Sequence, residues 1–370
     1  MPWDILIKNA LVFDGRASAP SEQDVAVADG KIAEVGEGLD AAKASEVVDA
    51  EGRWLTPGLW DIHTHLDLEV ELDPALTEVV RHGTTTAVVA NCSIGVPFGR
   101  QNEDGHDPVV SCFARVENIP KSVLRTVADK ITWDNPKAYL EHFDQIPLGA
   151  NIVPMIPHSM LRIEAMGLER AITEQPNEED IQKMEAILEQ AMKDGYAGFS
   201  TDMLPFHYMS DDPHRKLRIP ANHAPFHEVK RLTNVVRRYG RVWQATPEKD
   251  KPHNVLRWFM LSSGRFFGKP LKVTAVAALD VVTNRSLAKM GVTLTRLINS
   301  PLVDGKFRLQ ALAAPFRVYA DGAITPLAEE IPVLRELNEV DLVDREARMA
   351  LLNDPEFCKR FRRMWYHDKK

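Results

Sequence analysis

The stretch Leu55-Thr-Pro-Gly-Leu-Trp-Asp-Ile-His-Thr-His-Leu-Asp67 determines how the rest of the chain is interpreted. Residues 60–66 form a short, largely apolar run after a Pro-Gly turn, which predicts a buried strand. Because residues two apart in a strand point to the same side, we expect His63 and His65 to face one way. Two such imidazoles can bind one divalent metal ion such as zinc. The alternative, a pair of chance surface histidines, is disfavoured by the strand and turn around them.

The composition is that of a globular protein without a basic surplus. The chain has 370 residues, 44% hydrophobic and 26% charged, and its net charge of −8 argues against a nucleic-acid partner. Three scattered cysteines are too few for a disulfide framework, which favours a reducing compartment. We find no signal peptide and no apolar stretch near the roughly 20 residues that a membrane helix needs. We therefore expect a cytoplasmic protein that binds no membrane.

Two regions differ in their sequence pattern. Residues 1–56 alternate apolar and polar positions in short runs, and Asp29-Gly30 between two runs is a strong hairpin signal. We expect a small antiparallel sheet domain there. Residues 57–370 instead alternate strand-like and helix-like segments, which predicts an α/β domain with parallel pairing.

Seven strands separated by helices favour a closed (β/α)8-type (TIM) barrel over an open sheet. An eighth strand is missing from the pattern, because the segment from residue 334 to 365 is helical in character. The expected strands are residues 60–66, 84–92, 150–156, 196–201, 241–246, 271–279 and 307–312. The expected helices are residues 75–81, 137–145, 176–193, 227–239, 255–262 and 285–300.

Cys92 ends the second predicted strand and is a candidate third ligand beside His63 and His65. Active sites of such barrels lie at the carboxyl ends of the strands, where all three residues are expected. A thiolate there would lose its proton to the metal. The alternative is a buried structural cysteine, a common fate of a lone cysteine.

The segments that carry these residues resemble the amidohydrolase superfamily, and specifically its N-acyl-D-amino-acid deacylase branch. The resemblance rests on Pro57-Gly-Leu-Trp-Asp-Ile-His-Thr-His-Leu-Asp67 and Gly83-Thr-Thr-Thr-Ala-Val-Val-Ala-Asn-Cys-Ser-Ile-Gly95. It implies a small N-terminal β-sandwich portion joined to a metal-dependent barrel that hydrolyses the amide of N-acyl-D-amino acids. It also implies one or two zinc ions bound by His63, His65 and Cys92, with the cysteine bridging if two ions bind.

The sequence departs from this branch in several places. Deacylases place a histidine on the fifth strand and another on the sixth, whereas this chain has Gln244 on the fifth and none between residues 271 and 279. The fourth strand ends at Ser200-Thr201 without a lysine for a bridging carbamate. The family's catalytic aspartate belongs to an eighth strand, and the second half of the sandwich comes from the C-terminus. We therefore expect a barrel that is incomplete at its C-terminal end, with little or no turnover.

No residue is a strong candidate for the general base that amide hydrolysis needs. Asp67 and Asp202, each just past a strand end, are weak candidates, and a solvated or capping role is the simpler interpretation.

Two pairs of residues are candidates for binding a substrate carboxylate, for which the arginine fork is well suited. They are His158 with Arg162 and His207 with Arg218, in loops expected at the same face of the barrel. Exposed polar residues of loops are often only solvated, which is the alternative.

The sequence thus predicts a hydrolase of carbon–nitrogen bonds that acts on a small N-acyl amino acid. One alternative is hydrolysis of a cyclic amide or ureide with the same metal ligands. Another is a non-catalytic barrel that acts as a binding or assembly partner, which the missing histidines favour. A seven-stranded barrel would also expose unpaired sheet edges, so we expect aggregation or pairing with another chain in an oligomer.

Overall fold

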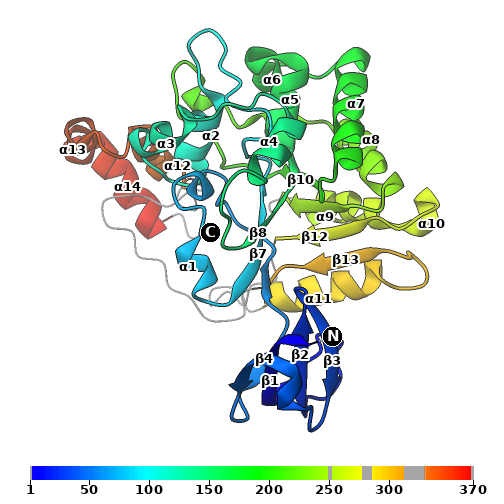
Figure 1. Ribbon diagram of the computed structural model, residues 1–370. Helices are drawn as coiled ribbons and strands as arrows, with labels where there is room; N and C mark the ends of the chain where they lie inside the picture. The colour runs from blue at the N-terminus through cyan, green and yellow to red at the C-terminus, as the bar shows by residue number, and fades with distance from the viewer. Residues whose placement is uncertain (1, 249–251, 277–285, 312–328, 330, 368–370) are drawn as a thin grey trace. The chain divides into compact units, whose positions relative to one another are not determined.

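The computed structural model describes residues 2–248, 252–276, 286–311, 329 and 331–367 (Figure 1). The chain divides into two compact units. The first comprises Met1–Trp60 and Gly83–Thr85, and the second comprises Asp61–His82 and Thr86–Lys370. The domain boundary predicted between residues 56 and 57 stays a prediction.

The first unit is a five-stranded sheet in the order β3-β2-β1-β4, with β5 also paired to β1. Asp29 and Gly30, with φ of 50° and 69°, form the predicted hairpin turn between β2 and β3. The expectation of a purely antiparallel sheet is wrong, because β4 and β5 run parallel to β1. The strands are β1 (Trp3–Val12), β2 (Ser21–Ala28), β3 (Lys31–Gly36), β4 (Ala44–Asp49) and β5 (Trp54–Leu55).

The reason for the parallel pairing is the connection between β3 and β4. It runs through the short 3-10 helix Ala41–Lys43, capped by Asp40, and returns the chain to the end of the sheet at which β1 begins. Trp3 therefore pairs with Ala44 at the start of both strands.

The second unit has the α/β organisation that the sequence predicts. Its strands follow the orders β6-β7-β8 and β9-β10-β11-β12-β13, and Met155 alone separates β8 from β9. The pairs β7–β8 and β9 through β13 are parallel. The strands are β6 (Leu59–Asp61), β7 (Thr84–Val89), β8 (Asn151–Pro154), β9 (Ile156–Pro157), β10 (Gly198–Asp202), β11 (Val242–Thr246), β12 (Lys272–Ala275) and β13 (Lys306–Leu309).

All seven predicted barrel strands are therefore confirmed in position, with β8 and β9 together forming the third. Buried residues such as Phe199, Trp243 and Phe307 line the core between these strands and the helices. The segment from residue 334 to 365 is helical as predicted, over Pro332–Asn338, Arg345–Asn353 and Pro355–His367. Residues 312–328 lie outside the described residues, so the absence of an eighth strand stays a prediction.

The first barrel strand is shorter than predicted. It ends at Asp61, so His63 and His65 follow the strand instead of lying within it. The carboxylate of Asp61 accepts a hydrogen bond from the backbone N–H of His63 at 3.3 Å, a local bond that competes with continuing the ladder. The expected burial of this strand is also wrong, since Trp60 is 65% exposed.

The helices of the second unit follow the predicted alternation, and α7 and α8 pack side by side (Figure 1). Asn177 and Asp180 form a capping box at the start of α7, and Gly195 ends it with a φ of 119°. The helices are α1 (Thr77–Val80), α2 (Pro108–Val116), α3 (Lys121–Ala128), α4 (Pro136–Phe143), α5 (His158–Met166), α6 (Leu168–Thr173), α7 (Glu178–Asp194), α8 (Phe226–Arg238), α9 (Pro252–Phe259), α10 (Gly264–Phe267), α11 (Ser286–Ile298), α12 (Pro332–Asn338), α13 (Arg345–Asn353) and α14 (Pro355–His367).

Each of the six predicted helices overlaps one of these elements. The connection between residues 94 and 149, predicted as a loop with one helix, also contains α2 and α3. Every residue of α2 is buried, although Ser111 and Arg115, four residues apart, give the helix a polar side. Among the described helices, none has the length and apolar composition that crossing a membrane requires.

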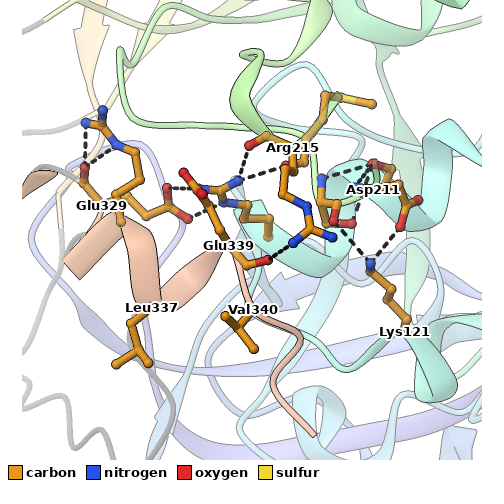
Figure 2. Close-up of polar contacts among 12 residues, drawn as sticks. Lys121, Asp211, Arg215, Glu329, Leu337, Glu339 and Val340 are labelled. Carbon is orange, nitrogen blue, oxygen red and sulfur yellow. Dashed lines mark hydrogen bonds and ion pairs between the residues drawn. The ribbon is translucent and has the colours of Figure 1, made fainter. Parts of the chain in front are cut away.

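The segment around α12 is fixed to α2 by a buried ion pair (Figure 2). Arg115 on α2 donates two hydrogen bonds to the carboxylate of Glu329, at 2.6 and 2.8 Å, and both side chains are almost completely buried. Arg335 on α12 donates to the backbone carbonyl of Glu329 at 2.9 Å. Nearby, Arg215 donates to the carbonyl of Glu339 at 3.1 Å. This network holds the C-terminal helices on the second unit.

We expect Glu329→Gln to lower the free energy of unfolding by about 3 kcal/mol, because it leaves the buried Arg115 charge without its counter-charge. Urea denaturation followed by circular dichroism measures this. The matched control is Glu336→Gln, which breaks a surface pair with Arg360 whose side chains are 39% and 47% exposed. The control substitution should lower the free energy of unfolding by under ~1 kcal/mol. Equal losses in the two variants would contradict the account.

Candidate metal centre

The structure brings His63, His65 and Cys92 together, as the sequence predicts. The side-chain Nε2 atom of His63 lies 3.1 Å from the Sγ atom of Cys92, and the two imidazole rings are 5.4 Å apart between centroids. The ligand atoms of the three residues all lie within 4.8 Å of one another. In the part of the chain that the structure describes, this is the only group of three or more His, Cys, Asp or Glu residues that meets such a criterion.

A cross-link between two backbone segments sets this spacing. Both the backbone N–H and the hydroxyl of Thr64 donate to the carbonyl of Val88, at 3.2 and 2.8 Å. The side-chain amide of Asn91 donates to the same carbonyl at 2.8 Å and to the carbonyl of Thr64 at 3.3 Å. The residues on either side of Thr64 are the two histidines, and Cys92 follows Asn91. The cross-link therefore positions all three candidate ligands.

The turn that carries Cys92 is conformationally unusual. Ala90, Cys92 and Ser93 have φ values of 60°, 49° and 65°, a left-handed region that non-glycine residues seldom adopt. A Cβ atom on Gly95 would lie 2.6 Å from the Cβ of Ala90, so only glycine fits there. The Asn-Cys-x-x-Gly motif singled out in the sequence thus encodes a tight turn that presents the thiol.

The donor set fits a divalent metal ion. Nitrogen and sulfur ligands of a tetrahedral zinc ion are roughly 3.5 Å apart, close to the observed separation of His63 and Cys92. The Nδ1 atom of His65 is buried and has no hydrogen-bond partner among the described residues. Burial raises the pKa of the Cys92 thiol, a shift that a neighbouring cation reverses. Metal binding itself stays a prediction.

Several polar neighbours of this cluster were not predicted as site residues. Gln310, just after β13, accepts a hydrogen bond from the Nδ1 atom of His63 at 2.7 Å. Gln244 on β11 accepts from the backbone N–H of Cys92 at 3.0 Å, and the Thr246 hydroxyl lies 3.4 Å from its Sγ atom. All three residues lie near or just after the ends of barrel strands. This position could have identified them in the sequence, because the active sites of barrels lie at strand ends.

Glu117, at the end of α2, has an Oε1 atom 3.4 Å from the Nε2 atom of His65. Burial lowers the pKa of His65, but the charge of Glu117 and the contact with Cys92 raise it, and the net shift is upward. No sequence signal pointed to Glu117, since it lies in the connection predicted to be mostly loop.

The two weak candidates for a general base differ in their surroundings. Asp67 is completely buried, so the solvated alternative is wrong for it, whereas a hydrogen bond with the backbone of Ala90 acts on its carboxylate and lowers its pKa against the effect of burial. Burial raises the pKa of Asp67 to about 7.

Asp202 is also completely buried, and its carboxylate accepts a hydrogen bond from the backbone N–H of Leu204 at 2.7 Å. This is a turn bond that caps no helix, because β10 ends at Asp202 and the next described helical turn begins at His214. Its other oxygen pairs with the Nδ1 atom of His207.

The candidate substrate residues His158 and Arg162 lie at the start of α5, completely buried. Both bind the carboxylate of Glu228 on α8, and the His158 Nε2 atom does so at 2.7 Å. An internal carboxylate thus occupies the arginine fork that we expected a substrate to use. The substrate-binding role of this pair stays a prediction.

His207 and Arg218 lie on adjacent backbone segments, since the N–H of Ile219 donates to the carbonyl of His207 at 3.2 Å. The His207 side chain is buried against Asp202, whereas Arg218 is exposed. Burial lowers the pKa of His207, but the charge and hydrogen bond of Asp202, together with the charges of Glu117 and Glu329, raise it, and the net shift is upward. The role of these residues in substrate binding is likewise untested.

Comparison with known proteins places this chain in a family. The model of the Amidohydrolase family matches residues 46–241, just over half of the chain. An uncharacterized protein of Mycobacterium tuberculosis is 35% identical over 98% of this chain and 59% of its own length. D-aminoacylase of Alcaligenes xylosoxydans xylosoxydans is 30% identical over 54% of this chain and 38% of its own length. The chain thus spans well under two thirds of these relatives.

Solved structures agree on the fold. A crystal structure of D-aminoacylase matches with a TM-score of 0.63 and 24% identity, over 84% of this chain and 58% of that one. N-acyl-D-glutamate deacylase of Bordetella bronchiseptica, solved with zinc and a phosphonate inhibitor, matches with a TM-score of 0.59 and 21% identity, over 80% of this chain and 57% of that one. At this identity the likeness establishes the α/β fold. From the family match and the fold, we conclude that the chain belongs to the amidohydrolase family.

Proposed function

We propose that the chain carries the metal centre of a zinc-dependent hydrolase that cleaves the amide bond of N-acyl-D-amino acids. The observation that carries the proposal is the convergence of His63, His65 and Cys92 on one point at the ends of the first two barrel strands. The relatives named D-aminoacylase and N-acyl-D-glutamate deacylase support the substrate class.

The three residues would hold the ion, which when bound polarises a carbonyl group and acidifies a water molecule. His63 contributes its Nε2 atom, because its Nδ1 atom is engaged by Gln310. Cys92 is buried and contributes a thiolate, whose charge partly neutralises the ion. The surrounding protein keeps bulk water away from the cysteine, which strengthens electrostatic interactions at this point.

The general base is the part of the reaction without an assigned residue. The carboxylate of Asp202 is bonded to the backbone of Leu204 and to the side chain of His207, and the carboxylate of Asp67 is completely buried. Neither arrangement shows how a proton would pass from water to the leaving nitrogen. We therefore expect substrate binding by this chain to be easier to detect than turnover.

We expect wild-type protein to retain zinc through dialysis, and the His63→Ala/His65→Ala double variant to lose it to background. Inductively coupled plasma mass spectrometry measures the zinc content per chain. The control is His227→Ala, which removes an exposed histidine at the start of α8 and should leave the content unchanged. No zinc in the wild type, or equal zinc in the double variant, would favour a non-catalytic barrel.

We expect N-acetyl-D-amino acids to raise the melting temperature of the zinc-loaded protein, and their L-enantiomers to have little effect. Ligands that bind only the folded state stabilise it by an amount that grows with the logarithm of the ligand concentration divided by Kd. The shift should vanish in His63→Ala and after zinc removal by a chelator. A larger shift with hydantoins would point to a cyclic amide substrate instead. Rapid hydrolysis that His63→Ala abolishes would confirm the reaction while contradicting the expectation of low turnover.

A further inference from the structure

We propose that two side-chain amides, Gln310 and Gln244, act with Thr246 as positioning residues that prepare His63 and Cys92 for the metal. Gln310 fixes which nitrogen of His63 carries the proton, and Gln244 with Thr246 fixes the conformation of Cys92 and the direction of its thiol. The inference rests on the metal binding in the proposed function. It assigns the positioning of two metal ligands to residues that are not ligands themselves.

The contact between Gln310 and His63 selects one tautomer of the imidazole. The amide Oε1 atom can only accept, so the Nδ1 atom of His63, 2.7 Å away, carries the proton. The unprotonated Nε2 atom then faces the Sγ atom of Cys92 at 3.1 Å. A neutral ring with a free Nε2 lone pair is the form that binds a metal ion.

Gln310 is itself held firmly. Its backbone N–H donates to the carbonyl of Ala275 at 2.8 Å, which prolongs the pairing of β13 with β12, and the residue is only 7% exposed. A side chain on a fixed strand end can orient its partner more exactly than one on a loop.

The second amide acts on Cys92. The Oε1 atom of Gln244 accepts from the backbone N–H of Cys92 at 3.0 Å, which stabilises the left-handed turn. The Nε2 atom of Gln244 donates to the Thr246 hydroxyl at 3.2 Å. That hydroxyl is therefore used as an acceptor by Gln244 and is free to donate its own proton to the Cys92 Sγ atom, 3.4 Å away.

Burial makes this chain of hydrogen bonds consequential. Gln244 is completely buried and Thr246 is 2% exposed, so water does not replace a missing donor there. Gln244 and Thr246 reach the same ligand because residues two apart on β11 point to the same side.

The test measures zinc affinity by competition with a chromophoric chelator for four variants. Gln310→Leu and Thr246→Val should each bind zinc about 10- to 100-fold more weakly than wild type. Gln310→Glu, which retains an acceptor for the His63 Nδ1 proton, should bind within a few-fold of wild type. The control Gln190→Leu changes an exposed glutamine on α7 and should bind like wild type.

A second readout separates positioning from general support of the fold. In cobalt-substituted protein, Thr246→Val should shift the thiolate-to-cobalt charge-transfer band, whereas Gln190→Leu should not. The melting temperatures of the metal-free variants should stay close to wild type. Zinc affinities equal to that of Gln190→Leu would overturn this inference alone. Wild-type protein that binds no zinc would overturn the proposed function and the inference with it.

Discussion

The candidate site depends on one cross-link between the segment after β6 and the end of β7. Thr64 and Asn91 both bond to the carbonyl of Val88, and Asn91 also bonds to the carbonyl of Thr64. Because these groups are buried, leaving any of them unpaired would be costly, so the two segments keep a fixed spacing. His63, His65 and Cys92 are direct chain neighbours of these residues, and their convergence follows from it.

Around that cross-link, the barrel supplies a surrounding layer of hydrogen bonds from distant strands. Gln244 and Gln310 come from β11 and the end of β13, and each contacts a different candidate ligand. Parallel strands that end at the same edge make this arrangement available, because every strand end faces the same site. The positions of the candidate ligands therefore depend on the whole sheet and not only on the two strands that precede them.

The sequence predicted the features that are encoded locally. The β-branched and apolar runs, separated by amphipathic helix patterns, predicted the positions of all seven strands. The motifs around His63 and Cys92 predicted the cluster of candidate metal ligands. The sequence did not predict contacts that depend on strand register over long distances, such as His63 with Gln310. It also did not reveal that the carboxylate of Glu228 on α8 would pair with Arg162, or that the backbone N–H of His63 would donate to the Asp61 side chain where β6 ends. Whether a side chain bonds to a local or a distant partner depends on packing, which a short sequence motif does not predict.

The most direct test of the account is zinc K-edge X-ray absorption of the zinc-loaded protein. The account predicts one sulfur and at least two imidazole nitrogens in the first coordination shell, at about 2.3 and 2.0 Å. It also predicts that Cys92→Ser removes the sulfur contribution, whereas Cys358→Ser, which changes a cysteine on α14, leaves it intact. A shell of oxygen ligands without sulfur in the wild-type protein would contradict the assignment of His63, His65 and Cys92 as the metal centre.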